Sequence, residues 1–294
     1  MGDENRRTLR KLQLCQLHML EEIDRICEAA GLTYYLFGGS AIGAVRHGGF
    51  IPWDDDLDIA MYRRDYELFQ KIMIEHHSDK YFLQSSETDA NYPRVIVKVR
   101  LKGTVQQERS YECVDCENGV YIDVFPIDYV SHPGGFGMWL RGKIVRLCFA
   151  YKTIWCGTDN GHNMELKKAL RFVVKCIPTG WIDRLMKYVC TKDNQKPRAY
   201  STVFLSGYGW KRQIHRSETI GKGKKIVFES GMFNAPADID TFLRNIYGDY
   251  MILPPPEKRK AHKLTRIDFG RYDEELECEV MAEEKETRNE CQNL

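Results

Sequence analysis

The sequence predicts an α+β fold, in which helices flank a β-sheet and a basic helical insertion covers residues 132–200. Two observations lead to this prediction. Several long segments repeat apolar residues at spacings of three and four, as amphipathic helices do, and short runs of β-favouring residues lie between them. The composition agrees, because 43% hydrophobic and 29% charged residues among 294 are ordinary for a globular chain and exclude a mainly disordered or fibrous one.

The same patterns predict each element in chain order. Gly31 stops the first helix, Ser40 is expected to cap the second with its side chain, and Pro126 closes the strand before it. The strand at 94–101 alternates apolar and basic residues, which predicts a half-exposed strand. The predicted helices are 6–30, 40–45, 66–74, 136–156, 165–190 and 239–247, and the predicted strands are 34–37, 57–61, 94–101 and 121–125.

Charge is balanced over the whole chain but not along it. The formal net charge of +1 gives no overall field to attract nucleic acid, so no nucleic-acid partner is expected. Residues 132–200, however, hold 13 basic and four acidic residues, a net charge of +9 that leaves −8 for the remainder. We expect one domain over 1–272, with a core at 31–130 and 201–272, and an acidic, weakly structured tail at 273–294.

Targeting signals and cysteines favour a cytoplasmic protein. No apolar run approaches the roughly 18 residues of a membrane span. The N-terminus lacks the apolar core of a signal peptide, and the ten cysteines are expected to be reduced. Cys113 and Cys116 are spaced like half of a zinc site, with Cys156 or His162 as later partners. A structural or incidental role is the favoured interpretation of this pair.

Residues 35–61 carry the main chemical signal. A predicted strand is followed by Gly38, Gly39 and Ser40 and then by a helix. Glycines let the backbone approach an anion, and a helix N-terminus offers free N–H groups to a phosphate. Because Gly-Gly turns are common, this signal is weak by itself.

Three carboxylates follow the glycine turn. Asp56 and Asp58 share one face of a predicted strand, since side chains alternate along a strand. The two acids repel each other unless a cation lies between them, and Mg²⁺ prefers oxygen ligands and binds substrate phosphates. Asp123 stands in an otherwise apolar strand, where a lone acid is costly without a partner. The alternatives are a solvent-facing pair and an edge-strand acid, but the combination is typical of a nucleotidyltransferase-type site.

These residues lie in the run GGSAIGAVRHGGFIPWDDDLDI at 38–59, which closely resembles the signature of the LicD family. The resemblance continues in YIDVFPID at 121–128 and in IYGDYMILPPPEKRKAH at 246–262. Where family members often have Thr-Leu-Leu after the two glycines, this chain has Ser40-Ala41-Ile42. LicD proteins and fukutin-related proteins share the nucleotidyltransferase superfamily, so the resemblance implies a nucleotidyltransferase-like mixed β-sheet.

The resemblance also implies roles for the motif positions. Asp56, Asp58 and Asp123 are expected to be the catalytic carboxylates and to hold one or two Mg²⁺ ions. Asp54 and Asp55 are expected to form a turn and to support them. The residues expected to contact substrate are Gly38, Gly39, Ser40, Arg46, His47, Trp53, Lys98 and His262.

The expected substrate contacts differ in kind. The glycine turn would contact the diphosphate, and Arg46 and His47 would neutralise phosphate oxygens, for which Arg is suited by its two-donor geometry. Lys98 would face the same cleft. Trp53 is expected to be a core residue, with one wall of a quaternary-ammonium pocket as the alternative. His262 lies in a motif whose role does not follow from the residues.

The resemblance implies a phosphotransferase with a CDP-alcohol donor. The expected reaction is Mg²⁺-dependent transfer of phosphocholine from CDP-choline to a sugar hydroxyl of a cell-surface glycan, such as a teichoic acid or lipopolysaccharide precursor. CMP would leave, and Asp123 would accept the hydroxyl proton. The alternatives are transfer of NMP from an NTP, transfer of glycerol or ribitol phosphate, and an inactive nucleotide-binding module.

The basic segment at 132–200 allows two interpretations. The favoured one is a set of core helices with solvated basic faces. The other is a peripheral contact with an anionic membrane, where each Lys or Arg adds on the order of 1 kcal/mol. That contact would place the protein at the inner face of the membrane, beside a lipid-linked acceptor.

Overall fold

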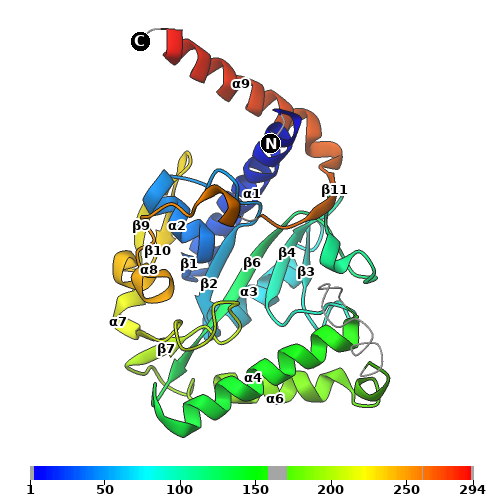
Figure 1. Cartoon of the computed structure of the whole chain (residues 1–294), viewed down its shortest axis with the longest axis vertical. Coiled ribbons are helices and arrows are strands. Elements are labelled where there is room, and N and C mark those ends of the chain that lie inside the picture. The colour runs from blue at the N-terminus through cyan, green and yellow to red at the C-terminus, as the bar shows by residue number, and fades with distance from the viewer. Residues whose placement is uncertain (1–2, 158–170, 260, 293–294) are drawn as a thin grey trace.

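A computed structural model describes residues 3–157, 171–259 and 261–292. Its centre is a mixed β-sheet flanked by helices (Figure 1), which confirms the predicted architecture. In this sheet β2 and β6 run parallel, and the other neighbouring pairs are antiparallel. The order is β1 (Tyr34–Leu36), β2 (Asp58–Tyr62), β6 (Tyr121–Val130), β4 (Val97–Leu101) and β3 (Tyr81–Gln84), while β7 (Tyr200–Thr202) extends β6 and pairs with β8 (His215–Arg216).

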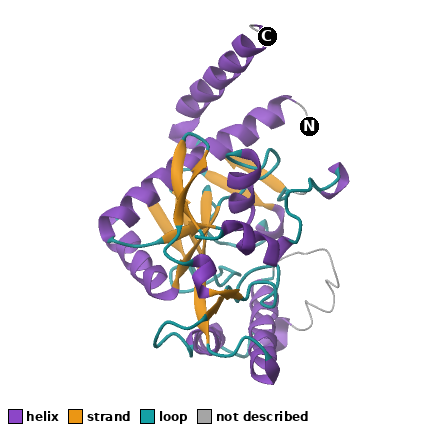
Figure 2. Cartoon of the chain, turned by 90° about the vertical axis from the view of Figure 1, so that its left-hand side faces the viewer, coloured by secondary structure: helices purple, strands orange, loops and turns teal. Residues whose placement is uncertain are grey.

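Helices pack on the sheet and form both ends of the molecule (Figures 1 and 2). Two helices, α4 and α6, lie at one end, and α9 lies at the other end together with both chain termini. Two further two-stranded antiparallel sheets are the hairpin of β9 (Lys224–Phe228) with β10 (Gly231–Ala235), and β5 (Val105–Glu108) paired with the distant β11 (Leu264–Asp268). The α-helices are α1 (Asp3–Ala30), α2 (Gly38–His47), α3 (Arg63–His76), α4 (Gly135–Cys156), α6 (Thr179–Thr191), α7 (Ser217–Ile220), α8 (Ile239–Tyr247) and α9 (Asp273–Gln292), and the 3₁₀ turns are Arg109–Tyr111, Pro256–Lys258 and Gly270–Tyr272.

The connection from β1 to α2 differs from the predicted one. Helix α2 begins at Gly38, and its N-cap residue Phe37 provides no side-chain cap. The Ser40 hydroxyl oxygen instead accepts a hydrogen bond from the backbone N–H of Asp58 at 2.8 Å. The predicted capping role of Ser40 is therefore wrong, and this side chain ties the first turn of α2 to β2.

Strand β4 is buried along its whole length, so the predicted half-exposed strand is wrong. Its basic side chains have polar partners inside the protein. Arg100 donates to Oε1 of Gln84 at 2.5 Å and to the carbonyl of Gly119 at 2.6 Å. Lys98 lies 2.8 Å from Asp123. The alternation of apolar and basic residues is the same whether the basic side chains are solvated or are buried against polar partners, so the sequence alone does not distinguish the two cases.

Strand β6 continues through Pro126 rather than ending before it. Pairing with β4 reaches as far as Val124, and pairing with β7 begins at Asp128. Pro126 therefore lies where one side of β6 has no strand partner, which is a place where a strand tolerates proline.

The predicted helix at 165–190 is interrupted. Helix α6 begins after Pro178, and proline disfavours a helical residue before it and cannot donate an N–H. Residues 158–170, including Lys167 and Lys168, lie outside the described residues.

Helices α4 and α6 pack antiparallel, since Arg141 bonds to Asp193 at 2.6 Å and Lys152 to Asp183 at 2.9 Å. Internal ion pairs thus neutralise part of the basic charge of the insertion. None of the described helices is both long and apolar enough to cross a bilayer.

The acidic C-terminal segment forms helix α9, which differs from the weakly structured tail that the sequence predicts. Leu276 and Val280 are buried, and α9 packs beside α1. Lys11 lies 2.6 Å from Asp273, and Arg7 lies 2.6 Å from Glu284. The basic face of α1 therefore neutralises a segment whose acids would otherwise repel each other.

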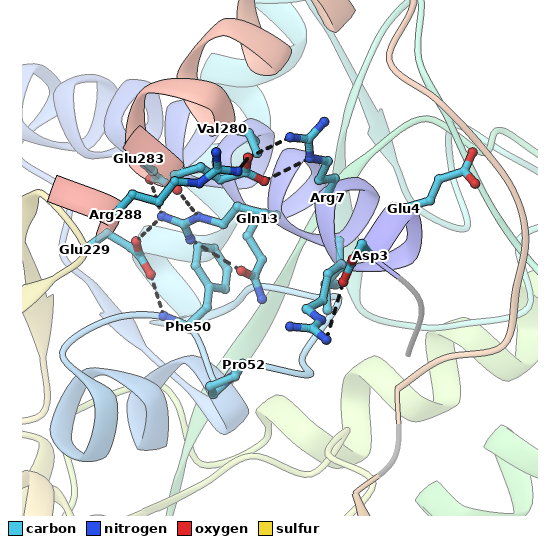
Figure 3. Close-up of a pocket in the computed structure, with 14 residues that line it drawn as sticks. Asp3, Glu4, Arg7, Gln13, Phe50, Pro52, Glu229, Val280, Glu283 and Arg288 are labelled. Carbon is cyan, nitrogen blue, oxygen red and sulfur yellow. Dashed lines mark hydrogen bonds and ion pairs between the residues drawn. The ribbon is translucent and has the colours of Figure 1, made fainter. Parts of the chain in front are cut away.

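Arg10 links three parts of the chain. One Nη lies 2.6 Å from Glu229 and 2.7 Å from Glu283, both of which Figure 3 labels. Glu229 also accepts a hydrogen bond from the Phe50 N–H at 2.8 Å. Helix α1, helix α9 and the loop that leads to the predicted carboxylates are joined in this way. A cavity of about 1250 Å³ opens beside this network, and none of the predicted site residues lines it.

Replacing Arg10 should therefore destabilise the fold. We expect Arg10→Met to lower the free energy of unfolding by about 2 kcal/mol, because two carboxylates lose a charged hydrogen-bond donor. Denaturant unfolding measures this directly. Arg6→Met is the matched control: the Arg6 side chain is 71% exposed and, within the described part of the chain, its one ion pair is with a solvated Asp3, so a change of less than about 0.5 kcal/mol is expected. Equal effects of the two substitutions would contradict this role of Arg10.

Candidate active site

Three side chains form a row across the centre of the sheet. Asp58 on β2 is in register with Asp123 on β6, and Asp123 is in register with Lys98 on β4. Lys98 Nζ lies 2.8 Å from Oδ1 of Asp123 and 3.9 Å from Glu108. Burial lowers the pKa of Lys98, and the two carboxylates oppose that shift. The structure thus places Lys98 beside a predicted catalytic carboxylate.

The glycine turn lies directly against the acids. Gly38 has a φ of +57°, and a Cβ there would overlap the Asp58 carboxylate. A Cβ on Gly39 would overlap the Asp54 carboxylate. Both glycines therefore let carboxylates approach the N-terminus of α2, where free N–H groups and the positive end of the helix dipole favour negative charge. In the structure, the missing Cβ atoms of the two glycines leave space for the carboxylates. Contact of these glycines with a diphosphate stays a proposal.

The acids are close enough to raise one another's pKa values. Burial and then the charges of Asp56 and Asp123 raise the pKa of Asp58 well above its usual range. Burial and the neighbouring Asp56 and Asp55 do the same for Asp54. The pKa of Asp56 is also raised, mainly by burial, although His262 opposes the shift. Asp54 thus belongs to the acid cluster itself, beyond the supporting role that the sequence predicts.

His262 pairs with Asp55 rather than standing alone. Its Nδ1 lies 2.9 Å from Oδ1 of Asp55 and 3.7 Å from Oδ2 of Asp56. The hydrogen bond to Asp55 raises the pKa of His262 to about 9, against the opposing effect of burial. At neutral pH the imidazole is therefore a cation that faces the acid cluster.

The donors present fit a divalent cation. Asp55, Asp56 and His262 are the group that comes close enough to share one ion, among the residues that the structure describes. The carboxylates of Asp58 and Asp123 lie next to Asp56, and with Asp54 they add further oxygen donors at this place. Oxygen donors that repel one another match a hard ion such as Mg²⁺. The identity of the ion remains a proposal.

Side-chain amides hold the acidic loop. Gln13 donates to the carbonyl of Asp54 at 2.9 Å, and Gln16 donates to the carbonyl of Asp55 at 3.1 Å. Gln106 donates to the same Asp55 carbonyl at 3.0 Å. Sequence reasoning missed these residues. The available signal was Gln16, a polar residue four positions from both Leu12 and Leu20 on the apolar face of the first helix.

Basic and aromatic residues lie near the C-terminal end of α2, where Arg46 and His47 form part of the last turn. Arg46 donates to the carbonyl of Tyr250 at 2.7 Å and to Nε2 of His47 at 3.0 Å. Burial and then the nearby Arg259 lower the pKa of Arg46. The Arg259 guanidinium lies 4.5 Å from the centroid of the Trp53 ring. Two arginines that repel each other are suited to an anion between them.

Trp53 is half-buried and already partnered. Besides Arg259, its ring meets the His47 ring edge-on at 6.3 Å. A guanidinium therefore occupies the position that a quaternary ammonium group would need on that face.

The cysteine pair gives no support for a zinc site. Cys113 is exposed and Cys116 half-buried, and neither joins a group of ligands within the described ranges. His162, one of the expected partners, lies outside the described residues.

Comparison with known proteins assigns this site to a family. Residues 31–141 match the LicD/FKTN/FKRP nucleotidyltransferase domain. Residues 31–141 therefore belong to the LicD/FKTN/FKRP nucleotidyltransferase domain family. The chain is 28% identical over 267 residues to the lipopolysaccharide cholinephosphotransferase LicD of Haemophilus influenzae, an alignment that covers 87% of this chain and 96% of that protein.

Two further relatives match only in part. The ribitol 5-phosphate transferase FKRP of Homo sapiens is 49% identical over 55 residues, which are 17% of this chain and 11% of FKRP. The mannosyltransferase regulator 4 of Saccharomyces cerevisiae is 24% identical over 123 residues, which are 39% of this chain and 10% of that protein. The LicD match, in contrast, extends over nearly the whole fold, including the insertion.

The glycine turn gives a direct test of the acid cluster. Gly38→Ala should abolish the thermal stabilisation that Mg²⁺ or Mn²⁺ gives the protein, because the new methyl group displaces the Asp58 carboxylate. Gly48→Ala is the control, since Gly48 also has a positive φ, of +70°, but a Cβ there meets no atom. Both variants carry the same kind of backbone strain, about 1 kcal/mol. Thermal unfolding with and without the cation separates the two effects, and equal cation responses in both variants would refute the placement of Asp58.

Proposed function

We propose that this protein transfers phosphocholine from CDP-choline to a sugar hydroxyl of a cell-surface glycan precursor. The observation that carries the proposal is the cluster of mutually repelling carboxylates at the N-terminus of a glycine-started helix, with arginines beside it. Such a site suits a diphosphate accompanied by a divalent cation. The likeness to LicD of Haemophilus influenzae over 96% of that protein supports choline phosphate as the transferred group.

The residues of the chain have separate tasks in this reaction. Arg46 and Arg259 bind the phosphate oxygens of the donor, and Asp56, Asp58 and Asp123 hold the cation. When bound, Mg²⁺ supplies charge neutralisation on the diphosphate and lowers the pKa of the acceptor hydroxyl. The acceptor oxygen forms a bond to the phosphorus of phosphocholine, the bond from that phosphorus to CMP breaks, and CMP leaves.

Asp123 is the proposed acceptor of the hydroxyl proton. Lys98, 2.8 Å away, stabilises the charged carboxylate, which is the form that can take up a proton. Lys98 is a positioning residue here, since it acts through Asp123.

Two alternative reactions use the same carboxylates. A nucleotidyltransferase would act on an NTP and release pyrophosphate, and a polyol-phosphate transferase would use CDP-ribitol or CDP-glycerol. The identity to FKRP over 55 residues favours testing CDP-ribitol as the second donor.

The purified chain should release CMP from CDP-choline in the presence of Mg²⁺ and a glycan acceptor, and it should release no pyrophosphate from CTP. Asp58→Asn should lower this rate at least about 100-fold, because a ligand of the cation is lost. Asp79→Asn changes an exposed acid outside the cluster and outside the motifs, and it should leave the rate unchanged. Pyrophosphate release from CTP would support the nucleotidyltransferase alternative. CMP release from CDP-ribitol alone would support the polyol alternative, and no turnover with any donor would support the inactive module.

The same variant should not be less stable without the cation. The folded-state pKa of Asp58 is raised, so its contribution to stability is fully present below the unfolded pKa and is lost as pH rises through the folded pKa. Near neutral pH and in EDTA, Asp58→Asn should therefore unfold at the same temperature as the wild type or higher. A clear loss of stability in EDTA would mean that the lost activity reflects misfolding.

A further inference from the structure

Helix α4 exposes a stripe of large apolar side chains. Phe136, Trp139, Leu140 and Leu147 are between 42% and 73% exposed, and their spacing of three, four and eleven places them on one side of the helix. The rings of Phe136 and Trp139 stack at 5.5 Å. Lys143 and Arg146 are exposed on the same side. Clustered exposed apolar residues of this size mark an interaction surface.

A basic basin adjoins this stripe. It has a volume of about 360 Å³ and lies between α4 and the loop at 207–212. Lys143 and Arg146 from α4 and Lys211 and Arg212 from the loop line it, and no acidic residue does. The shape of the basin depends on Gly142. A Cβ at this position would overlap the Trp210 ring, so the glycine lets the ring pack against α4. None of the four cations pairs with a carboxylate among the described residues.

The second helix of the insertion has an apolar stripe of its own, on the side that faces away from α4. Trp181, Leu185 and Tyr188 on α6 are between 44% and 70% exposed, and Lys192 continues their line one turn later. Helices α4 and α6 form one end of the molecule (Figures 1 and 2). The acidic helix α9, with nine acidic and two basic residues, lies at the opposite end.

We propose that the face formed by α4 and the 207–212 loop binds the surface of an anionic phospholipid bilayer. Its mixture of Trp, Tyr, Phe and Leu with Lys and Arg is the composition of segments that lie in a lipid interface. The basin supplies four cations for lipid phosphates, and anionic lipid attracts such basic groups. The acidic α9 at the far end is repelled by the same surface, so the charge distribution also fixes the orientation of the protein on the membrane.

The position of the basin links this surface to the acid cluster. Tyr208 lines the basin, and its ring packs against Tyr247 of α8 at 4.8 Å. Helix α8 in turn packs against α2, at whose N-terminus the acids lie. An acceptor held in the membrane by a lipid would therefore meet the protein beside its reactive site. The lipid contact itself does not rest on the proposed function.

Co-sedimentation of the full chain with vesicles tests the surface. We expect binding to vesicles of phosphatidylcholine with phosphatidylglycerol, weakening with added salt, and no binding to phosphatidylcholine alone. The binding should need no Mg²⁺, so it is separable from catalysis. Glycerol phosphate in solution should not displace the protein, because it offers the phosphate without the bilayer.

Two kinds of variant address the two components of the surface. Lys143→Glu with Arg146→Glu should lower the vesicle affinity at least about tenfold, and Phe136→Ser with Leu147→Ser should lower it without changing the salt dependence. Lys222→Glu with Lys224→Glu, two exposed residues at the start of the β9–β10 hairpin, is the charge-matched control and should bind normally.

Several results would overturn the proposal. They are the absence of binding to anionic vesicles at low salt, equal losses in the control and in the α4 variants, displacement by glycerol phosphate, and binding to RNA but not to vesicles. Because CMP release is measured without vesicles, failure of the lipid contact and failure of the proposed transfer reaction are distinguishable.

Discussion

The repulsion among the carboxylates of Asp54, Asp56, Asp58 and Asp123 is the constraint on which the rest of the structure depends. Buried like charges are unfavourable unless a cation or other partners compensate them. The fold supplies partial compensation through Lys98, protonated His262 and the N-terminus of α2. It also holds the loop in place from behind, through the amides of Gln13, Gln16 and Gln106. What remains is a site with excess negative charge, which a divalent cation would neutralise.

The division of charge over the molecule follows the same logic. The acid cluster lies at the N-terminus of α2, and Arg46 lies in its last turn with Arg259 nearby, so a diphosphate and its cation would both find opposite charge. On a larger scale, acidic α9 is neutralised in part by the basic face of α1, and the insertion with α4 and α6 carries an excess of basic residues at the other end. Local ion pairs such as Arg141 with Asp193 stabilise the insertion, while its exposed cations stay available to a partner.

The sequence predicts the parts of the fold that depend on short-range patterns. The strands that carry Asp58 and Asp123, the glycine turn and the helix at 239–247 follow from periodicity and from Gly and Pro positions. What fails depends on long-range partners. The burial of β4 requires Asp123 and Gln84 to receive Lys98 and Arg100, and the order of α9 requires the basic face of α1. The hydrogen bonds from Gln13, Gln16 and Gln106 to the acidic loop, and the pair of His262 with Asp55, join residues that are far apart in sequence. No local sequence pattern predicts such contacts.

Proton release on cation binding tests the central claim most directly. If mutual repulsion holds the acid cluster partly protonated, binding of Mg²⁺ must displace protons. Calorimetric titration at about pH 6 in buffers of different ionisation enthalpy measures their number. We predict binding with net proton release that declines as the pH is raised and that is absent in Asp58→Asn. Mg²⁺ binding without any proton release, or no binding at all, would contradict the account.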